Sequence, residues 1–469
     1  MKKTLKKIFA VLAIIILPAC SSDAKEKIEP SPTQINVSPS KSDTSNLGMC
    51  IPKTFNPLIN EDETVDKILR LIFEPLVKIN DDNTIENNLA QEITFDENYN
   101  ANINLKENIL WSDGTNLTAD DVLYSIDQIK SAPQNSIYKY VADNIGACKK
   151  ISPSELNVQF KNGAYVSNYV LDFPIIPKKY FAAKNQNNSL PICDGAYKFS
   201  SYTEIKNLSL EKNDQYFGQA PEFENINVII LPDANTNIDA FNQKIINQVQ
   251  TDADKIGKFH GYTKKIPIPT DELEFIFLNP ANNLFKIKPL RDAMVNILPL
   301  DDIKTSIYAS NLIESIFDTP IDKTTIDTAK QIISDYKPQS PLKILVNSEN
   351  TQRIKAAQLI KKSLNDLGID SIIEKNDFEQ YKSAVQNKNF DICIGAFKPS
   401  QKFHYKGLFA DGNVLGYKND DINEKWLKIN SAINKNEFDT AIKNFNTALK
   451  NSNLIILGSK IDFKISNFS

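Results

Sequence analysis

The sequence predicts a mixed α/β fold, because segments with strand periodicity and segments with helical periodicity alternate along its 469 residues. Residues 341–397 predict strand, helix, strand, helix and strand in turn, the order that builds a parallel sheet with right-handed crossovers. Residues 101–105 alternate apolar and polar side chains like a half-buried strand, and residues 225–231 form an almost continuous apolar run typical of a buried one. The body of the chain is therefore expected to hold sheets covered by helices.

Residues 1–19 have the pattern of a secretion signal. Four lysines flank the start of an apolar run of about ten residues, 8–17, which is too short to span a bilayer because that takes roughly 20. The run ends in Leu17-Pro18-Ala19-Cys20, which resembles the lipobox of bacterial lipoproteins. That resemblance implies cleavage before Cys20, lipidation of its thiol and anchoring of the mature chain to a membrane of the cell envelope, outside the cytoplasm. The alternative is an ordinary signal peptide with an unrelated cysteine.

Residues 20–46 predict a disordered tether, because small and polar residues dominate and large apolar ones are few. The body from residue 47 to residue 469 is long for one hydrophobic core, so we expect two or three packed lobes. Loss of the signal and its four lysines changes the formal net charge from −4 to −8. Such an acidic chain without a basic run argues against a nucleic-acid partner.

The cysteines and the motif inventory exclude several functions. Besides Cys20, the chain has Cys50, Cys148, Cys193 and Cys393; outside the cytoplasm these could form disulfides in three connectivities, and the sequence does not choose among them. No Cys-x-x-Cys spacing is present, which argues against a structural zinc site. Neither a hydrolase nucleophile elbow, a phosphate-binding loop nor a zinc-protease helix occurs, so we expect neither an enzyme nor a cofactor.

The first half of the body contains two readable segments. After the strand at 101–105, Asp113-Gly114 predicts a turn and Thr118 an N-cap, with Asp120 and Asp121 in the first turn of the helix that follows. In the second segment, Asp194-Gly195 predicts a turn. Strands are expected at 196–200, 208–212 and 225–231, and a helix at about 237–246.

The segment 341–397 locates a candidate binding site. Its predicted strands are 342–346, 369–373 and 390–397, and Gly368 is placed to end the first helix. Ligands bind at the carboxyl ends of parallel strands, which points to Asn347 and Ser348 and to Phe397 and Lys398. Arg353 lies in the first turn of the first helix, where a cation and a helix N-terminus together suit an anionic ligand group. A plain surface salt bridge of Arg353 is the alternative.

A series of short motifs follows in order between about residue 54 and residue 460. They are Phe55-Asn56-Pro57-Leu58, Phe73-Glu74-Pro75-Leu76-Val77, Leu89-Ala90, Trp111-Ser112-Asp113-Gly114-Thr115-Asn116-Leu117-Thr118-Ala119-Asp120-Asp121-Val122, Asp194-Gly195-Ala196-Tyr197-Lys198-Phe199, Asn213-Asp214-Gln215-Tyr216-Phe217-Gly218, Pro232-Asp233-Ala234, Pro289-Leu290-Arg291-Asp292-Ala293, Leu367-Gly368-Ile369 and Phe390-Asp391-Ile392. Together these segments resemble the family 5 extracellular solute-binding proteins, the dipeptide, oligopeptide and nickel receptors of ABC importers.

The resemblance implies a two-lobed trap of the type II periplasmic-binding-protein kind, with an extra subdomain on lobe I. Lobe I would comprise 47–267 with the return segment 453–469, its extra subdomain about 84–175, and lobe II 268–452. The crossings near 268 and 452 would form the hinge, and closure would bury the solute. Most motif residues, including Trp111, would be scaffold.

The resemblance also implies function and site. We expect a monomeric receptor that delivers a small solute, most simply a peptide, to an ABC permease in the membrane. Its ligand-binding residues would be Phe55, Asn56, Asn347, Ser348, Arg353, Phe397 and Lys398.

One departure from the family pattern bears on the cargo. Peptide-binding relatives carry an acidic residue in the loop after the third strand of segment 341–397, whereas residues 398–403 contain no carboxylate. Two alternatives to a peptide receptor stay open: a receptor for a nickel or other metal chelate, as in nickel-binding relatives, with His404 near the predicted pocket as a candidate ligand, and a sensor or adhesin that does not transport.

Overall fold

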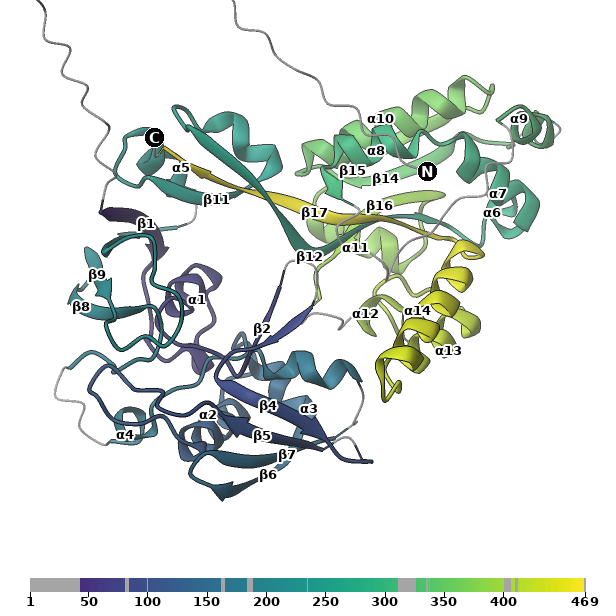
Figure 1. Ribbon diagram of the computed structural model, residues 1–469. Coiled ribbons are helices and arrows are strands. Elements are labelled where there is room, and N and C mark those ends of the chain that lie inside the picture. The colour runs from purple at the N-terminus through teal and green to yellow at the C-terminus, as the bar shows by residue number, and fades with distance from the viewer. Residues whose placement is uncertain are drawn as a thin grey trace, which may run out of the picture. The chain divides into compact units, whose positions relative to one another are not determined.

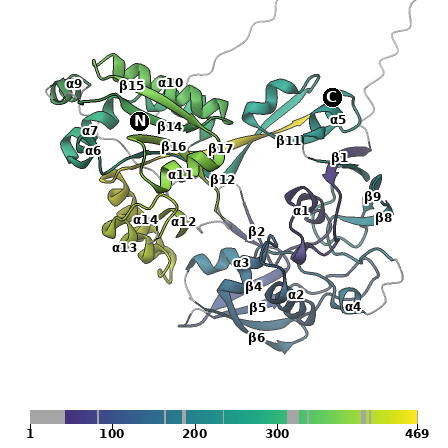
Figure 2. The ribbon, with the colours of Figure 1, turned by 180° about the vertical axis from the view of Figure 1, so that it is seen from behind.

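The computed structural model describes residues 43–80, 84–98, 100–161, 165–183, 189–233, 235–310, 326–334, 336, 338–399, 406–409 and 412–467 (Figures 1 and 2). Residues 42–469 form one compact unit, to which all the elements below belong. The predicted signal, Cys20 and the tether up to residue 42 lie outside the described residues, as do His404 and residues 400–403.

A four-stranded sheet brings the start of the body together with residues about 180 positions later. Its order is β1-β10-β9-β8, with β1 parallel to β10 and the other pairs antiparallel. β1 begins inside the stretch predicted as tether, because Thr44, Ser45 and Asn46 pair in register with residues 225–227 of β10. The strands are β1 (Thr44–Cys50), β8 (Tyr197–Thr203), β9 (Asn207–Lys212) and β10 (Asn225–Leu231).

A second four-stranded sheet, of order β4-β5-β7-β6, lies in the segment 84–175 that was predicted as the extra subdomain, and strand β2 of the hairpin β2-β3 lies just ahead of that segment. Helix α2 (Ala119–Ser131) begins where the sequence indicated, with Thr118 as N-cap and its N–H donating to Asp121 Oδ2 at 2.9 Å. Trp111 is buried in the same core as Leu117 and Val122. The strands are β2 (Val77–Ile79), β3 (Ile85–Asn87), β4 (Ala90–Phe95), β5 (Ala101–Leu105), β6 (Ile145–Ser152) and β7 (Glu155–Phe160).

The predicted strand-helix alternation at 341–397 is confirmed. β14 (Leu342–Asn347) pairs in parallel with both β15 (Ser371–Asn376) and β16 (Ile392–Phe397). Helices α10 (Thr351–Asn365) and α11 (Phe378–Gln386) cover opposite faces of these strands (Figures 1 and 2). The alternating side chains of β14 show why: Ile344 and Val346 pack in the core of α10, and Leu345 in that of α11. Gly368 ends the α10 segment with a φ of 72°, as a C′ glycine does.

Two long antiparallel strands, β12 (Lys264–Leu278) and β17 (Leu454–Ser466), run through the seven-stranded sheet of order β11-β17-β12-β16-β14-β15, with β13 on the side of β17. The predicted crossing near 268 falls inside β12, and that near 452 falls just ahead of β17. The β12–β17 ladder shifts register between Pro269 and Leu273 and again between Glu274 and Phe275. The remaining strands are β11 (Gln248–Asp252) and β13 (Ala309–Ser310).

The other helices complete the cores. They are α1 (Glu63–Leu69), α3 (Lys139–Asn144), α4 (Lys178–Phe181), α5 (Thr236–Asn242), α6 (Asn283–Lys286), α7 (Lys288–Ile297), α8 (Leu300–Ser306), α9 (Ile326–Ser334), α12 (Lys406–Phe409), α13 (Asp420–Ile429) and α14 (Lys435–Lys450), with 3₁₀ helices η1 (Pro57–Ile59), η2 (Tyr165–Leu171) and η3 (Ala253–Lys258). Within the described ranges, none of the helices has the length and apolar character needed to cross a bilayer. Cys50, Cys148, Cys193 and Cys393 are all free thiols.

Candidate functional site

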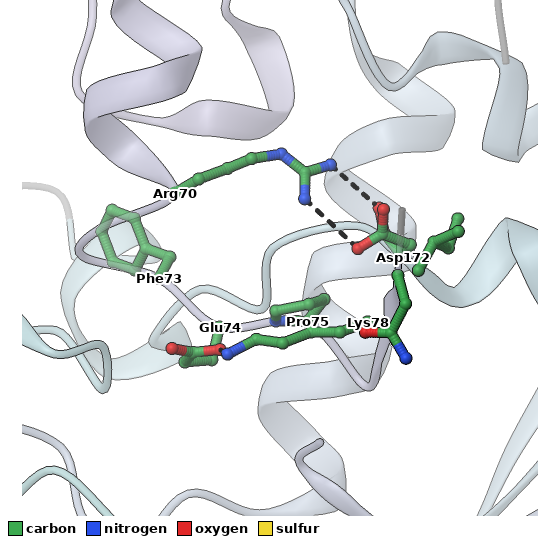
Figure 3. A pocket seen from close by; sticks show the side chains of 8 residues that line it. Arg70, Phe73, Glu74, Pro75, Lys78 and Asp172 are labelled. Atoms are coloured by element: carbon green, nitrogen blue, oxygen red, sulfur yellow. Dashed lines mark hydrogen bonds and ion pairs between the residues drawn. The ribbon is translucent and has the colours of Figure 1, made fainter. Parts of the chain in front are cut away.

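A cavity of about 360 Å³ opens beside the carboxyl end of α1 (Figure 3). Three parts of the chain form it: the C-cap of α1 with the segment after it, strand β2, and the residue that follows η2. Two cationic and two anionic side chains are among the residues that line it. The lining residues are Arg70, Phe73, Glu74, Pro75, Lys78, Ile79, Asn80 and Asp172.

One side of the cavity is an ion pair between Arg70 and Asp172. Arg70 Nη1 donates to Asp172 Oδ1 at 3.2 Å, and Nη2 donates to the main-chain oxygen of the same residue at 3.3 Å. Arg70 Nε donates to Tyr138 Oη at 2.9 Å, and that hydroxyl donates to Asp66 at 2.8 Å. These contacts hold the guanidinium in a fixed position, because they use three of its nitrogens.

The other side is an ion pair between Glu74 and Lys78. Lys78 Nζ lies 2.7 Å from Glu74 Oε2. The Glu74 carboxylate also accepts hydrogen bonds from Asn88 at 2.7 Å and from the hydroxyl of Tyr216 at 2.9 Å. Glu74 is buried, whereas the Lys78 side chain is 42% exposed. The Glu74 carboxylate is therefore held by three partners inside the protein, whereas the Lys78 side chain that pairs with it is partly exposed to solvent.

A second buried carboxyl group, that of Asp194, lies next to the main chain of Glu74. Its Oδ1 accepts the main-chain N–H of Glu74 at 3.1 Å, and its Oδ2 has no hydrogen-bond partner among the described residues. Burial, and then the negative charge of Glu74, raise the pKa of Asp194 well above its ordinary value. A proton on Asp194 lets the two carboxyl groups lie close together without mutual repulsion.

A second cavity, of about 180 Å³, lies along the long strands at the amino end of α10. It is lined by Asp252, Ala253, Asp254, Lys255, Glu274, Ile307, Tyr308, Asn350, Gln352 and Lys460. Asp252 lies 2.7 Å from the ammonium groups of both Lys255 and Lys460. Burial opposes ionisation of Asp252, but these two lysines lower its pKa to about 2. The charges of Asp252, Lys255 and Lys460 in this cavity are therefore already paired with one another.

Arg353, the predicted anion ligand, is engaged by two carboxylates. Its Nε and Nη2 donate to the two oxygens of Glu274 at 2.9 and 2.6 Å, and Nη2 also donates to Glu272 at 3.2 Å. Glu274 is 2% exposed and lies on β12. The salt bridge that the sequence left open as an alternative thus exists, but in a buried position. An anionic ligand would have to compete with these carboxylates for Arg353.

The remaining predicted ligand residues do not converge on either cavity. Phe55 packs edge-on against Phe199 and Tyr202, with ring centroids 5.3 and 4.9 Å away. Asn56 is buried, and its side chain accepts the N–H of Leu58 at the start of η1.

The residues at the carboxyl ends of the strands are also engaged locally. Asn347 accepts the N–H of Glu349, Ser348 donates its own N–H to Asn376, and Lys398 pairs with Glu63 at 2.5 Å. Phe397 packs against the core beneath β16. The turn before α10 does reach the second cavity, but through Asn350 and Gln352. As ligand contacts, these residues stay predictions.

The cavity at α1 was not predicted from the sequence. Glu74 lies in the motif Phe73–Val77 and Lys78 directly follows it, and their i,i+4 spacing was the available signal. Asp172 gave none, because its partner Arg70 is 102 residues away. Within the described residues, no three His, Cys, Asp or Glu side chains gather in a way that could hold a metal ion.

Comparison with known proteins assigns this architecture to a class. Its fold matches that of two-lobed binding proteins of known structure. They include the ABC transporter substrate-binding protein CtaP of Listeria monocytogenes (TM-score 0.72, 18% identity, 91% of this chain and 94% of that one) and the periplasmic murein tripeptide-binding protein MppA in its unliganded open form (TM-score 0.75, 14% identity, 91% and 94%). The mixed α/β, two-lobed fold class is thereby confirmed.

The family follows from the sequence matches. The model of the bacterial extracellular solute-binding proteins, family 5, matches residues 84–408. The chain belongs to this family; it is a solute-binding protein and not an enzyme. It is 26% identical over 277 residues to the oligopeptide-binding protein AppA of Bacillus subtilis, covering 55% of this chain but only half of that relative. It is 23% identical over 396 residues to the nickel-binding protein NikA of Staphylococcus aureus, covering 78% of each.

Proposed function

We propose that this chain is the receptor of an ABC importer and that its cargo is a peptide. The observation that carries the proposal is the family 5 match over residues 84–408, a range that includes β14, β15, β16 and the turn before α10. The relatives' names divide the cargo between oligopeptides and nickel.

The proposed site includes the residues expected from the family pattern. The proposed cargo contacts remain Phe55, Asn56, Asn347, Ser348, Arg353, Phe397 and Lys398. The smaller cavity reaches the segment at the start of α10 through Asn350 and Gln352. Arg353 would act on the cargo chiefly by fixing the amino end of α10 through Glu272 and Glu274. Lys398 would approach the cargo only by leaving Glu63, which is itself 66% exposed.

We also propose that the mature chain is anchored through a lipidated Cys20, in the cell envelope, and works as a monomer. The support is the lipobox-like run 17–20 behind a short apolar segment. Labelling cells with a radioactive fatty acid tests this. The label should enter the wild-type chain and be absent from Cys20→Ala. Equal labelling of the two proteins would contradict the anchor.

Thermal unfolding tests the cargo directly. The full chain is heated with pools of two- to six-residue peptides and, separately, with nickel–histidine. A peptide at 100 times its Kd should stabilise the chain by about 2.7 kcal/mol. Stabilisation by nickel–histidine alone would transfer the proposal to a metal chelate, with His404 as the first residue to substitute. If neither shifts the unfolding, the non-transport alternative replaces both.

A further inference from the structure

A basic patch lies beside the point at which the proposed tether enters the body. It draws on three parts of the chain: the loop after α5, the end of η3 and the start of β12. We infer that this basic patch binds the anionic phospholipid surface of the membrane that anchors the chain. The inference rests on the proposed anchor through Cys20 and adds a second contact with the same membrane. The patch consists of Lys244, Lys258, Lys264 and Lys265.

The tether meets the body close to Lys244. β1 begins at Thr44, and Asn46 of this strand exchanges two hydrogen bonds with Asn247. The N–H of Asn247 donates to the main-chain oxygen of Asn46 at 3.0 Å, and the N–H of Asn46 donates to Asn247 Oδ1 at 2.8 Å. The N–H of Asn467 donates to the oxygen of Asn247 at 3.0 Å. Figures 1 and 2 both show the carboxyl end of β17 beside α5, β11 and β1.

The other three lysines are held against the same region. The side chain of Asn242, at the end of α5, donates to the main-chain oxygen of Lys258 at 2.9 Å. The N–H of Thr263, which directly precedes Lys264, donates to the oxygen of Ser466 at 2.8 Å. Residues 242–247, 258–265 and the end of β17 are therefore neighbours, although they come from separate parts of the sequence.

The charges of the basic patch are available to a partner. All four lysines are exposed, and among the described residues none of them is paired with a carboxylate, in contrast to Lys255, which lies 2.7 Å from Asp252. Lys265 Nζ lies 4.1 Å from the centre of the Phe463 ring, a contact that leaves its positive charge uncompensated. Residues 236–267 contain five lysines and three aspartates, whereas the whole chain has a formal net charge of −4. This region is therefore locally basic in an acidic chain and attracts an anionic surface.

Exposed apolar side chains lie between these lysines in the sequence. Ile245 is 45% exposed, Tyr262 37% and Ile266 38%. A lipid surface accommodates both kinds of side chain, because its headgroups attract lysines and its interfacial layer takes up tyrosine and aliphatic side chains. The combination of free lysines and exposed apolar side chains thus fits a membrane surface.

Protection of a strand edge explains only part of the basic patch. Residues 264–269 pair with β17 alone, and lysines on an unpaired strand edge prevent edge-to-edge association. That role would account for Lys264 and Lys265. It does not account for Lys244 and Lys258, which lie outside the strands.

The length of the tether favours the membrane as the occupant. Residues 21–43 separate Cys20 from β1. For the disordered tether that the sequence predicts, the root-mean-square distance between its ends is about 26 Å. The entry point, and with it the basic patch, is then held near the lipid surface. At such a high effective concentration even a weak attraction leads to contact.

Lysine labelling on vesicles tests the inference. The full chain, isolated from the cell envelope in mild detergent, is transferred to vesicles of phosphatidylcholine or of equal parts phosphatidylcholine and phosphatidylglycerol. Acetic anhydride then modifies the lysines, and mass spectrometry measures each one. Lys258, Lys264 and Lys265 should react at least about five-fold more slowly on the anionic vesicles, because the lipid covers them. The difference should disappear in about 0.5 M salt, which screens the attraction. Lys362 on α10, whose side chain is 78% exposed, should react equally on both.

Two double variants localise the effect. Lys264→Gln, Lys265→Gln should bring the reaction of Lys258 on the anionic vesicles to within about two-fold of its rate on the neutral ones, because half of the charge of the basic patch is gone. Lys361→Gln, Lys362→Gln is the matched control, an adjacent lysine pair on α10 outside the patch. It should leave Lys258 as protected as in the wild type. Thermal unfolding verifies that both variants fold.

Flotation of the same vesicles separates the inference from the proposed anchor. A chain that floats with both kinds of vesicle and is acetylated equally on both overturns the basic patch as a lipid contact, while the anchor stands. Protection found only on native envelope membranes would assign the patch to a protein partner and overturn the inference as well. A chain that floats with neither vesicle overturns both proposals. A chain that floats only with the anionic vesicles supports the basic patch and overturns the anchor.

Discussion

Arg353 is the residue at which a prediction from sequence and an observed contact differ most. Its position in the first turn of α10 suggested a ligand for an anionic group, and the structure places its guanidinium on Glu274 and Glu272 instead. The sequence could not show this, because both carboxylates lie about 80 residues earlier, on a strand whose register comes from tertiary pairing. Arg353 therefore stabilises the junction between α10 and β12.

Arg353→Met should lower the free energy of unfolding by about 3–5 kcal/mol, because it leaves the buried carboxylate of Glu274 without its cation. Urea denaturation at neutral pH measures the change. The double variant Arg353→Met, Glu274→Gln should recover much of the loss, since the uncompensated charge is gone. A loss below about 1 kcal/mol in the single variant would contradict the conclusion that the Arg353–Glu274 ion pair is buried and stabilises the fold.

Asp194 leads to a prediction about pH. Burial raises its pKa in the folded chain well above the ordinary value of 3.8. The folded chain then keeps a proton that the unfolded chain loses, so this residue makes the free energy of unfolding fall as pH rises from about 4 through the raised pKa, by up to about 1.4 kcal/mol per pH unit.

Asp194→Asn should remove that fall, because an amide does not ionise. Urea denaturation of both proteins between pH 4.5 and pH 8 gives the comparison. The wild type should lose stability relative to the variant as pH rises. Parallel profiles for the two proteins would show that Asp194 is ionised in the folded state.

At the scale of elements, local sequence patterns predicted the helices and strands whose structure is determined by contacts within the same segment. The helix after Thr118 and the alternation at 341–397 were predicted, because capping and side-chain periodicity lie within each segment. Strand β1 was not predicted, and the predicted tether ended too late, since Thr44, Ser45 and Asn46 have no strand pattern and are ordered by β10, 181 residues away. The cavity at α1 was missed for the same reason: it joins α1, β2 and the end of η2.

The turn before β8 shows how closely two elements approach. A Cβ on Gly195 would lie 2.6 to 2.7 Å from main-chain atoms of Leu71 and Ile72, just after α1. Backbone atoms cannot yield as a flexible side chain does. Gly195 N–H also donates to the oxygen of Ile72 at 2.8 Å. Because residue 195 has no side chain, the turn before β8 can lie directly against Leu71 and Ile72, which belong to the segment that forms one wall of the cavity.

Gly195→Ala should lower the free energy of unfolding by about 1–3 kcal/mol or more, as overpacking does. Gly257→Ala is the control, because a Cβ there meets nothing within 4 Å; it should change stability by less than about 0.5 kcal/mol. The midpoints of urea unfolding measure both variants. Equal effects at the two glycines would refute the close approach at residue 195.

At the scale of the whole molecule, the series of motifs that resemble the family in their order along the chain predicted more of the fold than any single sequence pattern did. The family and its two-lobed fold are confirmed by the matches over 84–408 and by solved structures. The lobe boundaries stay predictions, although β12 and β17, with their two register shifts, are the strands on which the predicted crossings fall. The cargo is the property that is hardest to predict from the sequence, because it depends on charged side chains that the fold brings together from distant segments.

Native mass spectrometry of the full chain, isolated from the cell envelope in mild detergent and then mixed with short unblocked peptides, tests the central claim most directly. The claim is that this family 5 receptor captures a peptide. We predict one bound peptide per chain, either retained from the cell or acquired from the mixture. A chain that acquires no peptide from the mixture, while it carries or takes up a nickel chelate, would contradict the account.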